Sequence, residues 1–123
     1  MDPETRKGLI RQLAEAFGEL TDVTPADDQP LHVIFNELAL PSPWRPSPAR
    51  ALAIFNNWPE QRPEFYVDFT VVNDTGQPPR SPIDTLKVGE TWRGYSFTFP
   101  WPQAPATAVR AIQLWITRFS EKT

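Results

Sequence analysis

Four side chains are the candidates for acid–base or nucleophilic chemistry in this sequence: His32, Asp68, Glu90 and Ser96. A serine nucleophile needs a neighbouring base to take its proton, and histidine is the usual base at neutral pH. His32 is the only histidine of the chain. No spacing joins it to the other three residues, so the sequence predicts no catalytic set. We expect His32 to be a surface residue or a hydrogen-bonded core residue.

Metal and redox chemistry find little support in the residue types. Asp27 and Asp28 are adjacent oxygen ligands, but no third ligand follows at a recognisable spacing, so a solvated loop is the expected structure. The chain has no cysteine, which leaves it without disulfides, thiolate metal ligands or a cysteine nucleophile. The sequence predicts that the protein is not an enzyme and needs no cofactor.

Length and charge narrow the class of protein further. The chain has 123 residues, of which 40% are hydrophobic, so we expect one domain over residues 1–123. Its net charge is −3, whereas nucleic-acid binders usually present a basic face. No apolar run reaches the ~18 residues of a membrane span, and the polar start Met1–Glu4 is unlike a signal peptide. These features favour a cytoplasmic protein that binds neither nucleic acid nor membranes.

The stretch from Arg50 to Val72 predicts two strands joined by a stiff loop. The first strand covers 51–55, the loop covers 56–63 with Trp58 at its start, and the second strand covers 64–72. The second strand alternates, with Phe65, Val67, Phe69 and Val71 on the expected buried face. Tyr66, Asp68 and Thr70 fall on the opposite face, which we expect to be wetter.

Helical patterns begin and end the chain. Asp2 and Pro3 favour the start of an amphipathic helix over residues 3–20. Apolar residues recur at helical steps from 106 to 122, and a strand over 109–119 would mix polar and apolar side chains on one face.

Strands, loops and one turn are predicted between these helices. We expect a polar loop over 21–30, a strand over 31–40, a turn at 73–76 and an aromatic strand-like segment over 92–101. Residues 41–48 form a proline-rich connector. Either Trp44 packs it onto the domain as a rigid loop, which we favour, or it is an extended ligand for an aromatic groove.

Together these elements predict an α+β fold. An antiparallel β-meander of about four strands is flanked by an N-terminal and a C-terminal helix. The alternative is an immunoglobulin-like β-sandwich with an N-terminal helix, which requires residues 109–119 to form a strand.

This order of elements resembles the ubiquitin-conjugating-enzyme (UBC) fold, including the ubiquitin E-two variants and RWD domains. In that family a tyrosine–proline pair, two residues and two prolines lie between the second and third strands. Here Trp58–Pro63 keeps the first and last prolines, with Trp58 for tyrosine and Arg62 for one proline. The family's tryptophan turn before a helix is similar to Trp101–Pro105, which precedes 106–122.

The departures from the family decide the expected function. Active members carry a cysteine before the tryptophan turn, which forms a thioester with ubiquitin. This chain has none, and Ser96 is the nearest nucleophile in that region. The histidine–proline–asparagine signature of the family is also missing. The resemblance therefore implies a member that lacks the catalytic group.

We expect a non-catalytic protein-binding module, bacterial in character and accessory to a ubiquitin-like or other multi-protein system. Its partner would be another protein, such as a ubiquitin-like protein or an activating enzyme. Tryptophan and arginine are frequent interface anchors, so the candidate contact residues are Trp44, Trp58, Arg62 and Trp92. For each of them, packing within the domain is the competing interpretation. An immunoglobulin-like accessory domain and an enzyme of unrecognised class are the alternatives.

Overall fold

The N-terminal helix α1 (Pro3–Phe17) has the predicted start and a slightly earlier end. A computed structural model describes residues 2–26, 28–56, 58, 60–61, 63–78, 91–95 and 108–119 of the chain. The Asp2 carboxylate accepts a hydrogen bond from the Thr5 N–H at 2.9 Å, which caps the first turn. Gly18 follows the helix with a φ of 87°, a conformation that favours glycine. The helix therefore ends at Phe17 and not at residue 20.

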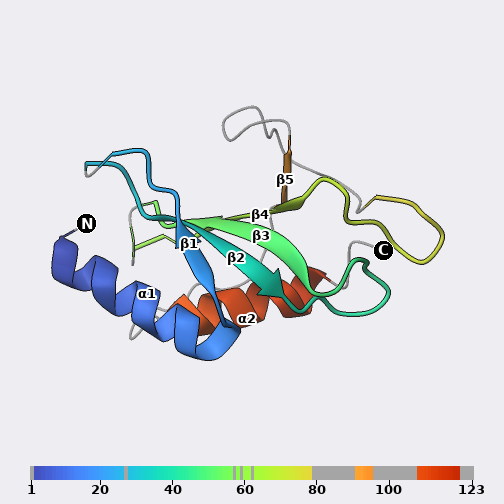
Figure 1. Ribbon diagram of the computed structural model, residues 1–123, viewed down its shortest axis with the longest axis horizontal. Helices are drawn as coiled ribbons and strands as arrows, with labels where there is room; N and C mark the ends of the chain where they lie inside the picture. The colour runs from blue at the N-terminus through green and yellow to red at the C-terminus, as the bar shows by residue number, and fades with distance from the viewer. Residues whose placement is uncertain are drawn as a thin grey trace.

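Five antiparallel strands form one open sheet in chain order, as Figure 1 shows. They are β1 (Leu20–Asp22), β2 (His32–Leu38), β3 (Ala49–Ile54), β4 (Glu64–Asp68) and β5 (Trp92–Tyr95). This arrangement confirms the α+β class and the antiparallel order, but the described strands number five and not four. The additional strand is β1. It lies where the sequence predicts helix and polar loop, and it is held by pairing that runs from Leu20↔Phe35 to Asp22↔Val33.

Strand β4 is shorter than predicted because its last residue forms a turn. The Asp68 carboxylate accepts hydrogen bonds from the main-chain N–H and the hydroxyl of Thr70 at 3.0 and 2.7 Å. The chain leaves the sheet at this point, and Phe69 is 46% exposed, so its predicted burial is wrong. On the opposite face, Asp68 is half-buried and Thr70 exposed as expected, but Tyr66 is fully buried and not on a wetter surface.

The C-terminal helix α2 (Ala108–Phe119) lies with α1 on one face of the sheet (Figure 1). The ring of Trp115 stacks between Phe65 of β4 and Phe119, with centroid distances of 5.0 and 5.2 Å. Phe17 of α1 meets Phe35 of β2 edge to face at 5.7 Å. Since 108–119 is a helix, the β-sandwich alternative is wrong.

A second buried cluster lies on the opposite face of the sheet. The register places Ile34, Leu52 and Tyr66 side by side on β2, β3 and β4. Trp92 of β5 belongs to the same cluster, and the guanidinium of Arg50 lies 5.3 Å from its ring centroid. The sheet therefore contributes apolar side chains to cores on both of its faces.

Within the described residues, no helix is long and apolar enough to cross a membrane.

Candidate functional site

The loop between β2 and β3 is anchored to the end of α2 by Trp44. The indole N–H of Trp44 donates to the Phe119 carbonyl at 3.2 Å, and the two rings lie 5.1 Å apart. A carbonyl in the last turn of a helix has no partner within the helix, so this bond satisfies a group that would otherwise need water. Trp44 is only 2% exposed. The predicted packing of Trp44 onto the domain is confirmed.

Two further sets of hydrogen bonds hold this loop. Arg45 and Val72 exchange main-chain hydrogen bonds, each 2.8 Å long, which join the loop to the segment after β4. The Ser47 hydroxyl accepts from the Leu40 N–H at 3.0 Å and donates to the Leu40 carbonyl at 3.2 Å. The loop is therefore fixed at its two ends and at its centre without a partner protein.

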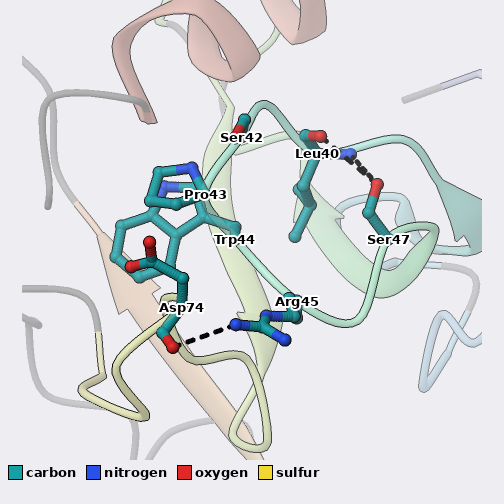
Figure 2. Close-up of a pocket in the computed structure, with 7 residues that line it drawn as sticks. All are labelled: Leu40, Ser42, Pro43, Trp44, Arg45, Ser47 and Asp74. Atoms are coloured by element: carbon teal, nitrogen blue, oxygen red, sulfur yellow. Dashed lines mark hydrogen bonds between the residues drawn. The ribbon is translucent and has the colours of Figure 1, made fainter.

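A hollow of about 410 Å³ opens between the loop and the segment after β4, and we call it the loop hollow. Figure 2 shows its lining, which includes Ser42, Pro43, Trp44, Arg45, Ser47 and Asp74. Arg45 Nη2 donates to the main-chain carbonyl of Asp74 at 2.9 Å. The Asp74 carboxylate points away from that guanidinium (Figure 2). The hollow is thus lined by one positively charged and one negatively charged side chain, which form no ion pair with each other.

The predicted turn at Asn73–Gly76 positions Asp74. Asn73 Oδ1 accepts hydrogen bonds from the N–H and the hydroxyl of Thr75 and from the N–H of Gln77, at 2.8–2.9 Å. Gly76 has a φ of 82°, which suits the residue that closes this turn. Because these bonds occupy the side chain of Asn73, the neighbouring Asp74 is left at the exposed tip of the turn.

Of the three predicted contact residues that the structure describes, only Trp44 lies at the loop hollow. Trp44 lines it, although most of its ring is buried. Trp92 is 8% exposed and lies in the core on the second sheet face. Trp58 is half-buried and meets Phe55 edge to face at 5.3 Å, and Arg62 lies outside the described residues. For Trp44 and Trp92 these positions support the packing interpretation.

Sequence reasoning missed Arg45 and Asp74. Both had a visible signal: Arg45 is the charged residue within a proline-rich connector, and Asp74 occupies the second position of a turn sequence. What the sequence does not show is that these two segments meet. That depends on the pairing of Arg45 with Val72, which are far apart along the chain.

The structure does not assemble the candidate catalytic residues. His32 lies at the start of β2, and its Nδ1 is 2.7 Å from the Pro30 carbonyl, to which it donates. Asp68 lies at the end of β4, and its register partner is Trp92 and not a residue near His32. Glu90 and Ser96 lie outside the described residues, as does Asp27. Among the residues that are described, no three His, Cys, Asp or Glu side chains form a group that could hold a metal ion.

A polar cluster ties α1 to β1. Arg6 Nε lies 3.5 Å from Asp22 Oδ2, and Asp22 Oδ1 accepts hydrogen bonds from the N–H and hydroxyl of Thr24. Burial raises the pKa of Asp22, but the Thr24 hydrogen bonds together with the charges of Arg6 and His32 outweigh it. The net pKa lies below its usual value. The cluster is positioned to stabilise the fold by linking α1 to β1.

Comparison with family models, with curated proteins and with solved structures finds no significant match to this chain.

Proposed function

We propose that this chain is a non-catalytic protein-binding module with a UBC-like fold, accessory to a ubiquitin-like or other multi-protein system. The observation that carries the proposal is the order of elements: a capped N-terminal helix, an antiparallel meander and a C-terminal helix packed on the same sheet face. That order supports the proposal in its helix–meander–helix outline, with five described strands in place of the expected four; the Trp58–Pro63 and Trp101–Pro105 motifs are the sequence features that resemble the family.

The chemistry of the sequence supports a binding role over catalysis. Thioester formation needs a thiolate, and these 123 residues contain no cysteine. A serine hydroxyl would need an activating base, and the only histidine donates from Nδ1 to a main-chain carbonyl at the start of β2. The rigidly held loop hollow is instead suited to contact with another protein.

The first experiment tests the absence of covalent chemistry. The protein is incubated with ATP, an activating enzyme and its ubiquitin-like protein, and products are separated under denaturing conditions with and without hydroxylamine. We expect no adduct on this chain, while a cysteine-containing conjugating enzyme in a parallel reaction forms one. A hydroxylamine-sensitive adduct that disappears in Ser96→Ala would overturn the non-catalytic assignment and identify an oxyester at Ser96.

A second measurement tests the binding role. Isotopically labelled protein is titrated with the ubiquitin-like protein and, separately, with the activating enzyme, and amide resonances are followed. A saturable set of shifts confined to one surface is the expected result with one of these partners. No shifts with either at millimolar concentration would contradict the proposed class of partner.

A further inference from the structure

The loop hollow contains opposite charges that are both available to a ligand. Arg45 uses one guanidinium N–H for the Asp74 carbonyl, and the guanidinium group has five such donors. The Asp74 carboxylate accepts no hydrogen bond from the residues that the structure describes, and it is turned away from Arg45 (Figure 2). Both residues are exposed. Each charge can therefore bind an opposite charge without breaking a bond within the protein.

This arrangement favours a ligand that carries two charges. A purely anionic ligand is attracted by Arg45 and repelled by Asp74, and a purely cationic ligand meets the reverse. A ligand with one charge of each sign gains both attractions when each group reaches its opposite. Arg45 can also bind a carboxylate through two parallel N–H donors, which adds a geometric requirement.

The remaining walls suit side chains with apolar stems. Pro43, which is half-buried, offers apolar surface beside the two charged side chains; Leu40 and Trp44 also line the hollow but are almost wholly buried. Lysine, arginine and glutamate bury their methylene groups on such surfaces while their charged ends stay accessible. The volume of about 410 Å³ lies in the range of pockets that hold a small ligand or a few residues. The hydrogen bonds of Ser47 and the Arg45–Val72 pairing shape the hollow before any ligand binds.

We propose that the loop hollow binds a short segment of a partner protein that carries one basic and one acidic side chain. The basic group pairs with Asp74, and the acidic group pairs with Arg45. This inference rests on the proposed function, because a binding module supplies the protein partner. The inference adds to that function the charges that the recognised segment of the partner carries.

Two other features of the described residues do not indicate a particular ligand. A second hollow of about 420 Å³ lies between α1 and α2, but its lining of Gln12, Glu15, Ala16 and Val109 does not select one ligand. The apolar second face of the sheet is buried. Of these two hollows, the loop hollow is the one lined by two opposite charges that do not pair with each other.

The test uses four capped pentapeptides as probes: Ala-Lys-Ala-Glu-Ala, the same peptide with lysine and glutamate exchanged, and two in which glutamine replaces either charged residue. Each is titrated into isotopically labelled protein at low salt, and the amide and indole N–H resonances are followed. We expect one mixed-charge order to shift the resonances of Ser42, Arg45 and Asp74 saturably. Its affinity should exceed that of either singly charged peptide at least threefold.

Two variants separate the charges from the shape of the hollow. Asp74→Asn keeps the main-chain carbonyl that accepts from Arg45, and Arg45→Gln keeps a side-chain donor near that carbonyl. Asp74→Asn should reduce the affinity for the mixed-charge peptide to that of the glutamate-only peptide. Arg45→Gln should reduce it to that of the lysine-only peptide. Glu60→Gln, an exposed charge outside the hollow, should leave all four titrations unchanged.

Several results would overturn the inference. They are equal affinities for mixed and singly charged peptides, shifts that fall outside the hollow, no shifts at all, or unchanged titrations in both hollow variants. If a partner protein binds wild type and both variants equally, the binding module is retained and this site within it is rejected. Failure of every partner to bind, with peptide binding intact, rejects the proposed class of partner and leaves the site.

Discussion

One side-chain hydrogen-bonded turn occurs three times in the described residues, and it determines which residues reach the surface. Asp22, Asp68 and Asn73 each accept, through Oδ1, the N–H and the hydroxyl of a threonine two positions later. Such turns give the backbone an alternative to strand pairing. The middle residues are Val23, Phe69 and Asp74, all exposed. The turns therefore account for the two large hydrophobic side chains that are exposed among the described residues, Val23 and Phe69, and for the charge presented in the loop hollow.

The Asp22 turn also predicts a pH dependence. Asp22→Asn keeps an oxygen acceptor for Thr24 but removes the negative charge beside Arg6 and His32. Because the folded pKa of Asp22 is lowered from its ordinary value of 3.8, its charge stabilises the fold above that value. The contribution is lost as the pH falls through the folded pKa. Since Asp22 is largely exposed, we expect wild type to be more stable at pH 7 by less than about 1 kcal/mol.

Urea denaturation of both proteins at pH 7, 5 and 2 measures this difference. The two midpoints should be separated at pH 7 and pH 5, and the separation should shrink toward pH 2 as the carboxylate takes up its proton. High salt should also reduce the separation at pH 7, because the Asp22 side chain is 39% exposed. A separation that stays constant across these pH values would mean that the charge of Asp22 does not stabilise the fold.

Elements with strong local signals were predicted from sequence, and elements fixed by tertiary contacts were not. Helix α1 was predicted because Asp2 caps it and Pro3 suits its first position. Strand β1 was missed because three residues, two of them polar, have no periodicity, and only pairing with β2 makes them a strand. The buried state of Tyr66 was missed because alternation indicates two faces but not that both are covered.

The loop hollow was predictable in part. The sequence indicated a rigid proline-rich loop packed by Trp44 and a turn at 73–76, and both are present. Their meeting point was not predictable, because the Arg45–Val72 bonds and the acceptor of Trp44 on α2 involve residues remote in sequence. Contacts of this kind depend on how the whole chain packs.

The docking of the loop on α2 predicts a graded loss of stability. Trp44→Phe keeps an aromatic ring against Phe119 but removes the indole N–H, so we expect a loss of about 0.5–1.5 kcal/mol, the usual net value of a hydrogen bond. Trp44→Ala also empties a buried site and should cost about 3–5 kcal/mol. Chemical denaturation measures both, and Ser42→Ala, at an exposed position of the same loop, is the control. Equal losses in the two tryptophan variants would show that the hydrogen bond carries the docking.

At the scale of the whole molecule, the sheet is the middle layer between two buried clusters. Both described helices lie on one face, while Ile34, Leu52 and Tyr66 are buried on the other. The strands follow chain order, so each pairs with its neighbour in sequence, and such sheets need no long crossover. Stability should therefore depend on both faces of the sheet and not only on the face that carries α1 and α2.

A matched pair of leucines tests this expectation. Leu13 of α1 is buried in the cluster on the helix face, and Leu52 of β3 is buried in the cluster on the opposite face. Removing a buried leucine side chain loses its transfer free energy and leaves a cavity, so Leu13→Ala and Leu52→Ala should each cost about 2–5 kcal/mol. Val23→Ala, at an exposed turn, should change stability by less than about 0.5 kcal/mol.

The double variant of Leu13 and Leu52 gives the sharper result. The two side chains belong to clusters on opposite faces of the sheet, so they share no cavity, and their losses should add to within about 0.5 kcal/mol. Urea denaturation of the two single variants and the double variant, each with an unchanged slope, measures this. If Leu52→Ala costs less than about 1 kcal/mol while Leu13→Ala unfolds the protein readily, the second face is not a core. The fold would then depend on its helix-covered face alone.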